Sequence, residues 1–262
     1  MGPVGRRAAL PLALLAAALV AALAGCRFDR AGPPVRTETP TPTATLAEQW
    51  LQRLAGDPVP ARVPEGGQVL YLQTFDGVGA GGEPGTGDAG AWRVEEDGER
   101  GGVYRGEAPA GQVSLRRVAQ GEGGPLELPQ RYYVEALVRP EAAPPAGATP
   151  SLHGFHAGPG RFLVVALAGG EEGGLAVRRA WGGPTAALAE CPVEGGVAPG
   201  RWYRLGMEVD LWTGQVTAYL NGEARTEGLS ELPLVRSGPG GVALGVVGGA
   251  AAFDDLVVWA LP

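Results

Sequence analysis

The chain has 262 residues, enough for one sizeable domain and additional segments. Its 28 acidic residues outnumber its 21 basic residues and no basic cluster is visible, which argues against nucleic acid as a partner. Glycine and proline are abundant, at 45 and 24 residues, and long helical patterns are nearly missing, so the composition favours an all-β chain rich in turns.

The sequence contains no lysine, so all 21 of its Lys/Arg residues are arginine. It also contains no isoleucine, and Asn221 is its one asparagine. Lysine, isoleucine and asparagine have A/T-rich codons, so these absences indicate a bacterial genome of high GC content. A thermophile would show the same preference for arginine, but codon bias explains the pattern without it.

The N-terminus resembles the signal peptide of a bacterial lipoprotein. Arg6 and Arg7 precede an uncharged apolar run over 10–23, and the sequence LAGC that ends at Cys26 resembles a lipobox. The resemblance implies cleavage after 1–25 and a diacylglyceryl group on the Cys26 thiol. An ordinary signal peptide or an uncleaved anchor is the alternative, although the run is short for a membrane span. We therefore expect a lipid-anchored cell-envelope protein whose domain faces outside the cytoplasm, in the periplasm or at the cell surface.

Residues 26–66 are expected to connect the anchor to the domain. The stretch 27–45 is rich in proline and threonine, cannot bury a core, and is typical of an extended tether. Residues 46–54 predict a short helix capped by Thr45, with an apolar face that includes Trp50. We expect this face to dock on the domain; the membrane surface or a partner protein is the alternative.

The domain, 67–262, shows short strand patterns about every ten residues with glycine-rich turns between them, as in a β-sandwich. No repeat period is visible, which argues against a propeller or solenoid. The strands are predicted at 69–75, 91–95, 102–106, 112–118, 131–139, 151–156, 161–168, 174–181, 185–191, 201–211, 215–220, 241–248 and 252–260.

The strongest pattern is a hairpin over 200–222. Residues 202–211 alternate between apolar and polar side chains, and the return strand over 215–220 ends at Asn221-Gly222, a pair suited to a tight turn. Such a hairpin has one apolar face and needs a second sheet to cover it. In the strand at 131–139, alternation turns Tyr133 and Glu135 away from the core and makes Leu137 an exposed exception.

Three stretches resemble the concanavalin A-like jelly-roll superfamily, in particular its laminin-G-like and 3-keto-disaccharide hydrolase-type domains. They are YLQTFDG at 71–77, the hairpin at 200–222 and FDDLVVW at 253–259. The resemblance spans roughly 68–262 and implies a β-sandwich whose first and last strands are neighbours. The matching positions are those that build a sandwich, so they indicate the fold more than an activity.

The resemblance also implies a structural calcium ion between the first and last strands. Calcium requires several oxygen ligands, and Asp76, Asp254 and Asp255 with loop carbonyls could supply them. The alternative is that these carboxylates cap turns and accept backbone hydrogen bonds.

Jelly rolls of this superfamily bind sugars on a concave face, with aromatic rings against pyranose rings and polar side chains on the hydroxyl groups. The alternative is that such aromatic side chains are covered by loops. His153 and His156 are the only histidines; on a regular strand they face opposite sides, so a site that uses both needs a bend at Gly154. The candidate ligand residues are Tyr133, Glu135, His153, His156, Arg178 and Trp181.

Glu208 and Asp210 match part of the E-x-D-x-x-E motif of laminarinase-type glycosidases. The third position is Thr213, so the motif is broken, and the two carboxylates are more simply the solvated side of the hairpin.

We expect a non-catalytic envelope domain that binds a saccharide. A glycan-processing enzyme, of the glycoside hydrolase or keto-disaccharide hydrolase type, is one alternative because the keto-disaccharide branch is enzymatic. A structural module that docks in an envelope assembly is the other.

Overall fold

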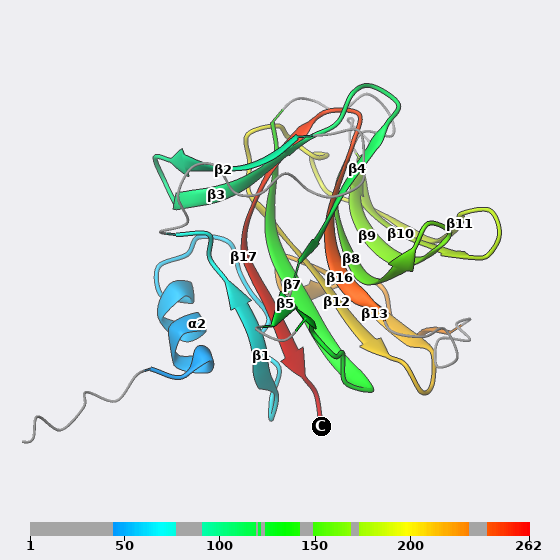
Figure 1. The fold of residues 1–262 in the computed structure, drawn as a ribbon, viewed down its shortest axis with the longest axis horizontal. Coiled ribbons are helices and arrows are strands. Elements are labelled where there is room, and N and C mark those ends of the chain that lie inside the picture. The colour runs from blue at the N-terminus through cyan, green and yellow to red at the C-terminus, as the bar shows by residue number, and fades with distance from the viewer. Residues whose placement is uncertain are drawn as a thin grey trace, which may run out of the picture. The chain divides into compact units, whose positions relative to one another are not determined.

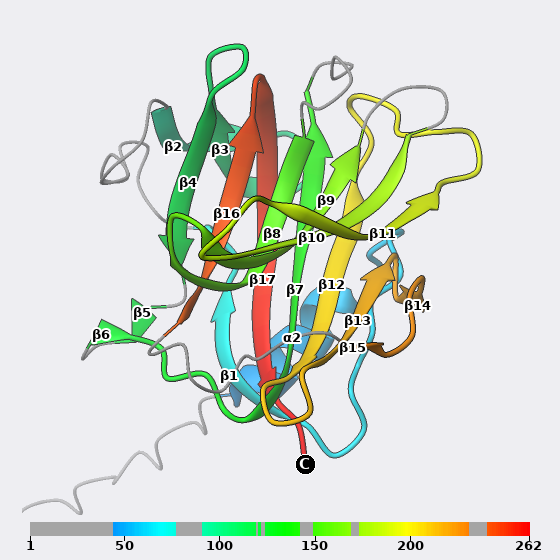
Figure 2. The same ribbon diagram turned by 90° about the vertical axis from the view of Figure 1, so that its right-hand side faces the viewer.

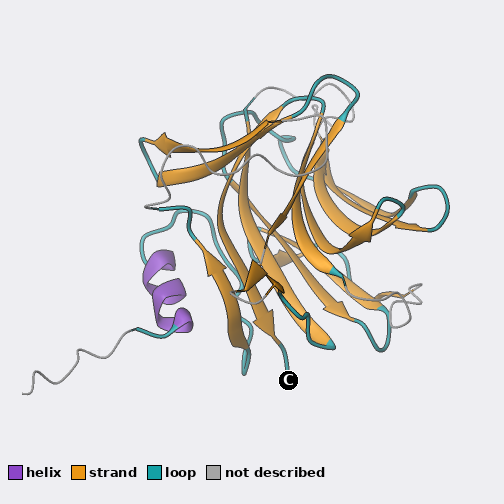
Figure 3. Ribbon diagram, viewed as in Figure 1, coloured by secondary structure: helices purple, strands orange, loops and turns teal. Residues whose placement is uncertain are grey.

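A computed structural model describes residues 44–76, 91–118, 120–121, 124–141, 149–168, 173–230 and 240–262. They belong to one compact unit, Ala44–Pro262, and form antiparallel strands and one described helix, α2 (Leu46–Leu54) (Figures 1 and 3). This helix falls short of the length and apolarity needed to cross a membrane, and no other described segment is helical. Cys26 and the predicted signal peptide lie outside the described residues.

Two antiparallel sheets face each other and form a β-sandwich. The nine-stranded sheet has the order β14-β13-β12-β7-β17-β3-β2, with β1 also paired to β17 and β15 to β13. The six-stranded sheet has the order β11-β10-β9-β8-β16-β4, and Figure 2 looks onto it. The strands are β1 (Gln68–Gln73), β2 (Ala91–Asp97), β3 (Gly101–Glu107), β4 (Val113–Val118), β5 (Gln120–Gly121), β6 (Gly124–Pro125), β7 (Arg131–Pro140), β8 (Thr149–Gly158), β9 (Arg161–Ala168), β10 (Gly174–Trp181), β11 (Ala186–Pro192), β12 (Tyr203–Asp210), β13 (Gln215–Leu220), β14 (Glu223–Ala224), β15 (Leu229–Ser230), β16 (Gly241–Val247) and β17 (Ala250–Ala260).

The predicted strands are confirmed, because each predicted range overlaps one strand of the structure. The sequence pattern missed the two-residue strands β5, β6, β14 and β15, which are too short to show alternation. The hairpin of β12 and β13 is confirmed as well, and Asn221 and Gly222 adopt φ values of 52° and 79°, the left-handed backbone of a tight turn.

The core lies between the two sheets and is built by alternation. Its β7 residues are Tyr132, Val134, Ala136 and Val138. Side chains from β12, β13 and β17 extend this inner face, and the facing side chains come from β8, β9, β10 and β16. Burial of this apolar surface on both inner faces is what holds the sandwich together.

Helix α2 packs on the outer face of the nine-stranded sheet, beside β1 (Figure 1), which confirms the predicted docking. Thr45 caps the helix: its hydroxyl accepts the Glu48 N–H at 3.2 Å, and the Glu48 carboxylate accepts the Thr45 N–H at 2.7 Å. Trp50 is fully buried, whereas Leu51 is 51% exposed, so the helix docks through a narrower stripe than its apolar residues suggest.

Candidate functional site

Three of the predicted ligand residues, His153, His156 and Arg178, lie on the outer face of the six-stranded sheet. A β-bulge in β8 is the reason that both histidines face outward. His153 pairs with Val164 of β9 and Phe155 pairs with the next β9 residue, so Gly154 is the extra residue. The two imidazole rings are 5.5 Å apart in an edge-to-face arrangement.

Glycine is required at the bulge. A Cβ atom on Gly154 would lie 2.6 Å from the sulfur of Met207, inside the core. The bend that a joint site of His153 and His156 requires is therefore present, and it depends on this glycine.

The strand register aligns polar and small residues in a row across this outer face. Arg117 of β4 pairs with Ala243 of β16, which pairs with His153 of β8. His153 pairs with Val164 of β9, which pairs with Arg178 of β10. Strands are about 4.8 Å apart, so each arginine backbone lies roughly 10 Å from that of His153, with one small side chain between.

A second row, with small residues between Leu115 and Glu190 at its ends, runs beside the first. Its members, in strand order from β4 to β11, are Leu115, Gly245, Ser151, Ala166, Ala176 and Glu190. The hydroxyl of Ser151 and Nε2 of His153 lie 2.5 and 3.1 Å from where a Cβ on Gly245 would stand, so they occupy the space that this glycine leaves. We call these two rows the six-stranded face.

The imidazole of His153 is neutral at physiological pH. Burial and, to a smaller extent, the neighbouring His156 together lower the pKa of His153 to about 3. Nδ1 of His153 is buried and has no hydrogen-bond partner in the described part of the chain. By contrast, the side chain of Arg178 is 47% exposed and lies 3.7 Å from Glu190, so it is accessible at the edge of the face.

The other predicted ligand residues lie elsewhere, which corrects the expectation of one ligand surface. Tyr133 and Glu135 do point away from the core, but α2 and residues 57–62 cover them and both are fully buried. Trp181 lies on the core side of β10 and stacks on Phe155, with ring centroids 5.6 Å apart. Tyr133 and Glu135 were expected to be exposed because alternation does not show what covers a face. Trp181 lies three residues after Arg178 on β10, so alternation turns it to the opposite side of the sheet.

Leu137 is also corrected, because it is fully buried rather than exposed. It belongs to a small cluster with Val103, Trp202 and Ala252, against which Val59 packs. The segment that follows α2 therefore covers this part of the outer face.

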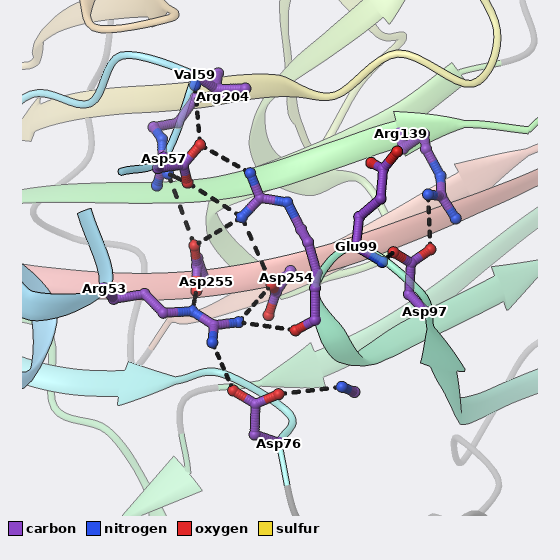
Figure 4. Close-up of polar contacts among 12 residues, drawn as sticks. Arg53, Asp57, Val59, Asp76, Asp97, Glu99, Arg139, Arg204, Asp254 and Asp255 are labelled. Atoms are coloured by element: carbon purple, nitrogen blue, oxygen red, sulfur yellow. Dashed lines mark hydrogen bonds and ion pairs between the residues drawn. The ribbon is translucent and has the colours of Figure 1, made fainter. Parts of the chain in front are cut away.

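A buried network of ion pairs lies under α2 on the nine-stranded sheet (Figure 4). Arg204 is fully buried and donates to Asp57 at 2.7 Å and to Glu135 at 3.2 Å. Arg100 donates to Asp57 at 2.8 Å and to Asp255 at 3.4 Å. Burial raises the pKa of Asp57, but hydrogen bonds and charges from the two arginines outweigh burial and hold the pKa below its usual value.

The three aspartates predicted to bind calcium converge at the edge of this network. Arg53 of α2 donates to Asp76, Asp254 and Asp255 at 2.7, 2.8 and 2.7 Å. As they stand, the described residues include no group of three or more His, Cys, Asp or Glu side chains that could hold a metal ion.

Glu208 lies on the same outer face and is held by two arginines. Arg62 and Arg131 each donate to its carboxylate at 2.7 Å. Burial raises the pKa of Glu208, but these hydrogen bonds outweigh burial and keep the pKa below its usual value. The Asp210 carboxylate accepts the N–H groups of Trp212 and Thr213 at the hairpin turn. Both carboxylates thus have structural partners.

A polar cleft of about 790 Å³ opens beside the network. It is lined by Arg53, residues 55–60, Glu99, Arg100, residues 200–202 and Asn221. Its arginines are tied to aspartates within the network, except Arg201, which lies against the ring of Tyr203. The cleft is of the right size for a small molecule.

The buried carboxyl group of Glu135 should make the stability of the folded protein depend on pH. Burial raises the pKa of Glu135 to about 7, against the opposing effects of Arg204, the Tyr133 hydroxyl and the N–H of Arg62. The folded protein therefore binds this proton more tightly than the unfolded chain, and the stability it contributes is lost as the pH rises through about 7. We expect the Tm to fall between pH 5.5 and 8, and less steeply in Glu135→Gln, as measured by scanning calorimetry.

Glu208→Gln is the control for this experiment. The pKa of Glu208 is lowered in the folded protein, so its contribution to stability is complete above the usual titration range of a glutamate. Its replacement should therefore leave the slope of Tm against pH unchanged between pH 5.5 and 8. Parallel slopes for the wild-type protein and Glu135→Gln would refute the assignment.

The comparisons with known proteins agree with the fold. No family model and no curated protein matches the chain. A carbohydrate esterase from the Shiga toxin-encoding bacteriophage phi24B is similar in structure, with 14% identity, a TM-score of 0.50, and coverage of 75% of this chain and 100% of that chain. The carbohydrate-binding module CBM66 from Bacillus subtilis has 9% identity, a TM-score of 0.47, and coverage of 67% and 98%. At these identities the likeness to the esterase shows a common β-sandwich fold.

Proposed function

We propose that this chain is a lipid-anchored protein of the bacterial cell envelope whose β-sandwich binds a saccharide on the six-stranded face. The observation that carries the proposal is the row in which Arg117, His153 and Arg178 are separated by Ala243 and Val164. Polar groups at regular intervals over small side chains suit an extended ligand with many hydroxyl groups.

The chemistry of the row supports a sugar more than an apolar ligand. The guanidinium groups of Arg117 and Arg178 are exposed hydrogen-bond donors, and between them lies the neutral imidazole of His153, which is 6% exposed and can donate from one nitrogen and accept at the other. Phe162 lies 5.5 Å from His153 and adds an aromatic ring beside the row. Glu190 next to Arg178 adds an acceptor at the edge.

The proposed location in the cell envelope rests on the sequence. The positive region, the apolar run and the LAGC tetrad support lipidation of Cys26, with 1–25 as signal peptide, 26–66 as tether and helix, and 67–262 as the sandwich. The stretches at 71–77, 200–222 and 253–259 support placement of the sandwich in the concanavalin A-like superfamily. The phage esterase of the same fold is described as acting on a carbohydrate, which is consistent with a glycan ligand.

Thermal unfolding in the presence of oligosaccharides tests the proposal. A ligand that binds only the folded state, at about 100 times its Kd, adds roughly 2.7 kcal/mol, or a rise of roughly 5–10 °C in Tm for a domain of this size. We expect such a rise with at least one saccharide, and its loss in Arg117→Ala/Arg178→Ala.

Arg161→Ala is the matched control. Arg161 is an exposed arginine of β9, but it lies on the same side of that strand as the core residues and not on the side of the row. Its replacement should leave the saccharide effect intact. No rise with any saccharide, or a rise that survives the double replacement, would contradict the proposal.

A further inference from the structure

The gap between β1 and β3 is where the three aspartates meet. Strand β17 pairs with β3 over Ala250–Phe253 and with β1 over Leu256–Ala260. Asp254 and Asp255 lie at the change of partner, and Asp76 comes shortly after the end of β1. Three carboxylates from segments far apart in the sequence therefore face one point.

The backbone is distorted so that these carboxylates converge. A register shift follows Asp254 in the pairing with β7, and Asp255 adopts a φ of 50°. Phe75, directly before Asp76, adopts a φ of 58°. Positive φ at residues other than glycine is strained and is retained mainly where function or packing requires it. Of the three such residues in the described chain, one is Asp255 itself and another, Phe75, directly precedes Asp76.

The site has the chemistry of a cation site. Asp254 and Asp255 are fully buried, and Oδ1 of Asp254 has no hydrogen-bond partner among the described residues. Buried carboxylates need a cation close by, because desolvation otherwise disfavours their charged form. A set of carboxylate oxygens is the donor set that calcium prefers.

A metal ion does not fit while α2 is docked, because Arg53 takes its place. Three nitrogens of one guanidinium contact three carboxylates: Nε contacts Asp255, Nη1 contacts Asp76 and Nη2 contacts Asp254, at 2.7, 2.7 and 2.8 Å (Figure 4). The planar guanidinium supplies a positive charge and directed hydrogen-bond donors, and the three carboxylates are sufficient to accept from it.

We infer that Asp76, Asp254 and Asp255 form a cation site that this chain fills with its own Arg53, so that docked α2 and a free divalent cation are alternative occupants. A cation that entered the site would displace Arg53 and weaken the attachment of α2. This inference is independent of saccharide binding, since the aspartates and the six-stranded face belong to different sheets.

The test compares calcium sensitivity in the wild-type protein and Arg53→Ala. Calcium at about 1 mM and EDTA should leave the wild-type Tm unchanged. Arg53→Ala should have a lower Tm, and calcium should raise that Tm by several degrees, because the carboxylates are then available. The added replacement Asp254→Asn should abolish the calcium effect.

Arg62→Ala is the matched control, because Arg62 also joins the segment around α2 to a carboxylate of the same outer face but lies away from the three aspartates. It should gain no calcium response. Arg53→Lys retains a tethered cation and should also remain insensitive to calcium. If Arg53→Ala does not fold, the same titration with Arg53→Gln decides. A wild-type Tm that calcium raises and EDTA lowers, or a variant at position 53 that no divalent cation stabilises, overturns the inference.

Discussion

Replacement of Arg204 by alanine should lower the free energy of unfolding by about 3–5 kcal/mol, the cost of removing one partner from a buried ion pair. Arg204 is fully buried and donates to both Asp57 and Glu135. Without the guanidinium, these two carboxylates stay buried with less compensation. Urea unfolding followed by tryptophan fluorescence measures the change.

A second replacement identifies the cause of the loss. Glu135→Gln removes one of the uncompensated charges, so the double variant Arg204→Ala/Glu135→Gln should be less destabilised than the sum of the single variants. Arg201→Ala is the control, since Arg201 lies three residues away, is exposed and has no described ion pair. A loss below about 1 kcal/mol in Arg204→Ala would show that the network does not hold this face together.

Replacement of Trp50 by alanine should cost about 3–5 kcal/mol, the usual range for a buried tryptophan, unless α2 detaches first. Trp50 packs against Val69, Tyr133 and Trp259, and the Arg204 guanidinium lies 5.1 Å from its ring. Hydrogen exchange distinguishes the two outcomes, because detachment removes the protection of the α2 amides while β12 and β17 stay protected.

Leu51→Ala is the control within the same helix. Leu51 follows Trp50 and is half exposed, so its replacement should change the free energy of unfolding by no more than about 0.5 kcal/mol. Equal effects of the two replacements would contradict docking through Trp50.

The sequence predicted the fold because the signals for it are local. Alternation placed Tyr132, Val134 and Val138 in the core, and Asn221-Gly222 predicted the hairpin turn. The helix at 46–54 and its cap at Thr45 are visible for the same reason. Each of these signals depends on neighbours within a few residues of the chain.

Burial of the nine-stranded outer face could not be predicted, because it depends on contacts between distant segments. Tyr133, Glu135 and Leu137 follow the alternation of an exposed face, and they are buried because α2 and the segment that follows it cover them. The role of Arg53 was missed for a related reason. An arginine in the last turn of a helix is typical of favourable interaction with the helix dipole, and nothing local connects it to Asp254, which lies far along the chain.

The six-stranded face was predicted in part. On a regular strand His153 and His156 face opposite sides and can share a site only with a bend at Gly154, which the bulge provides. Their alignment with Arg117 and Arg178 depends on the order and register of β4, β16, β8, β9 and β10, which a single sequence does not show.

Imidazole NMR of the ¹⁵N-histidine-labelled protein tests the saccharide proposal most directly. His153 and His156 are the only histidines, so every imidazole signal reports on the six-stranded face. A saccharide that raises the Tm should shift at least one of these signals in proportion to its binding, and Arg117→Ala/Arg178→Ala should remove the shift. A saccharide that raises the Tm and leaves both imidazoles unshifted would show that the ligand binds elsewhere, with the polar cleft beside Arg100 as the next place to look.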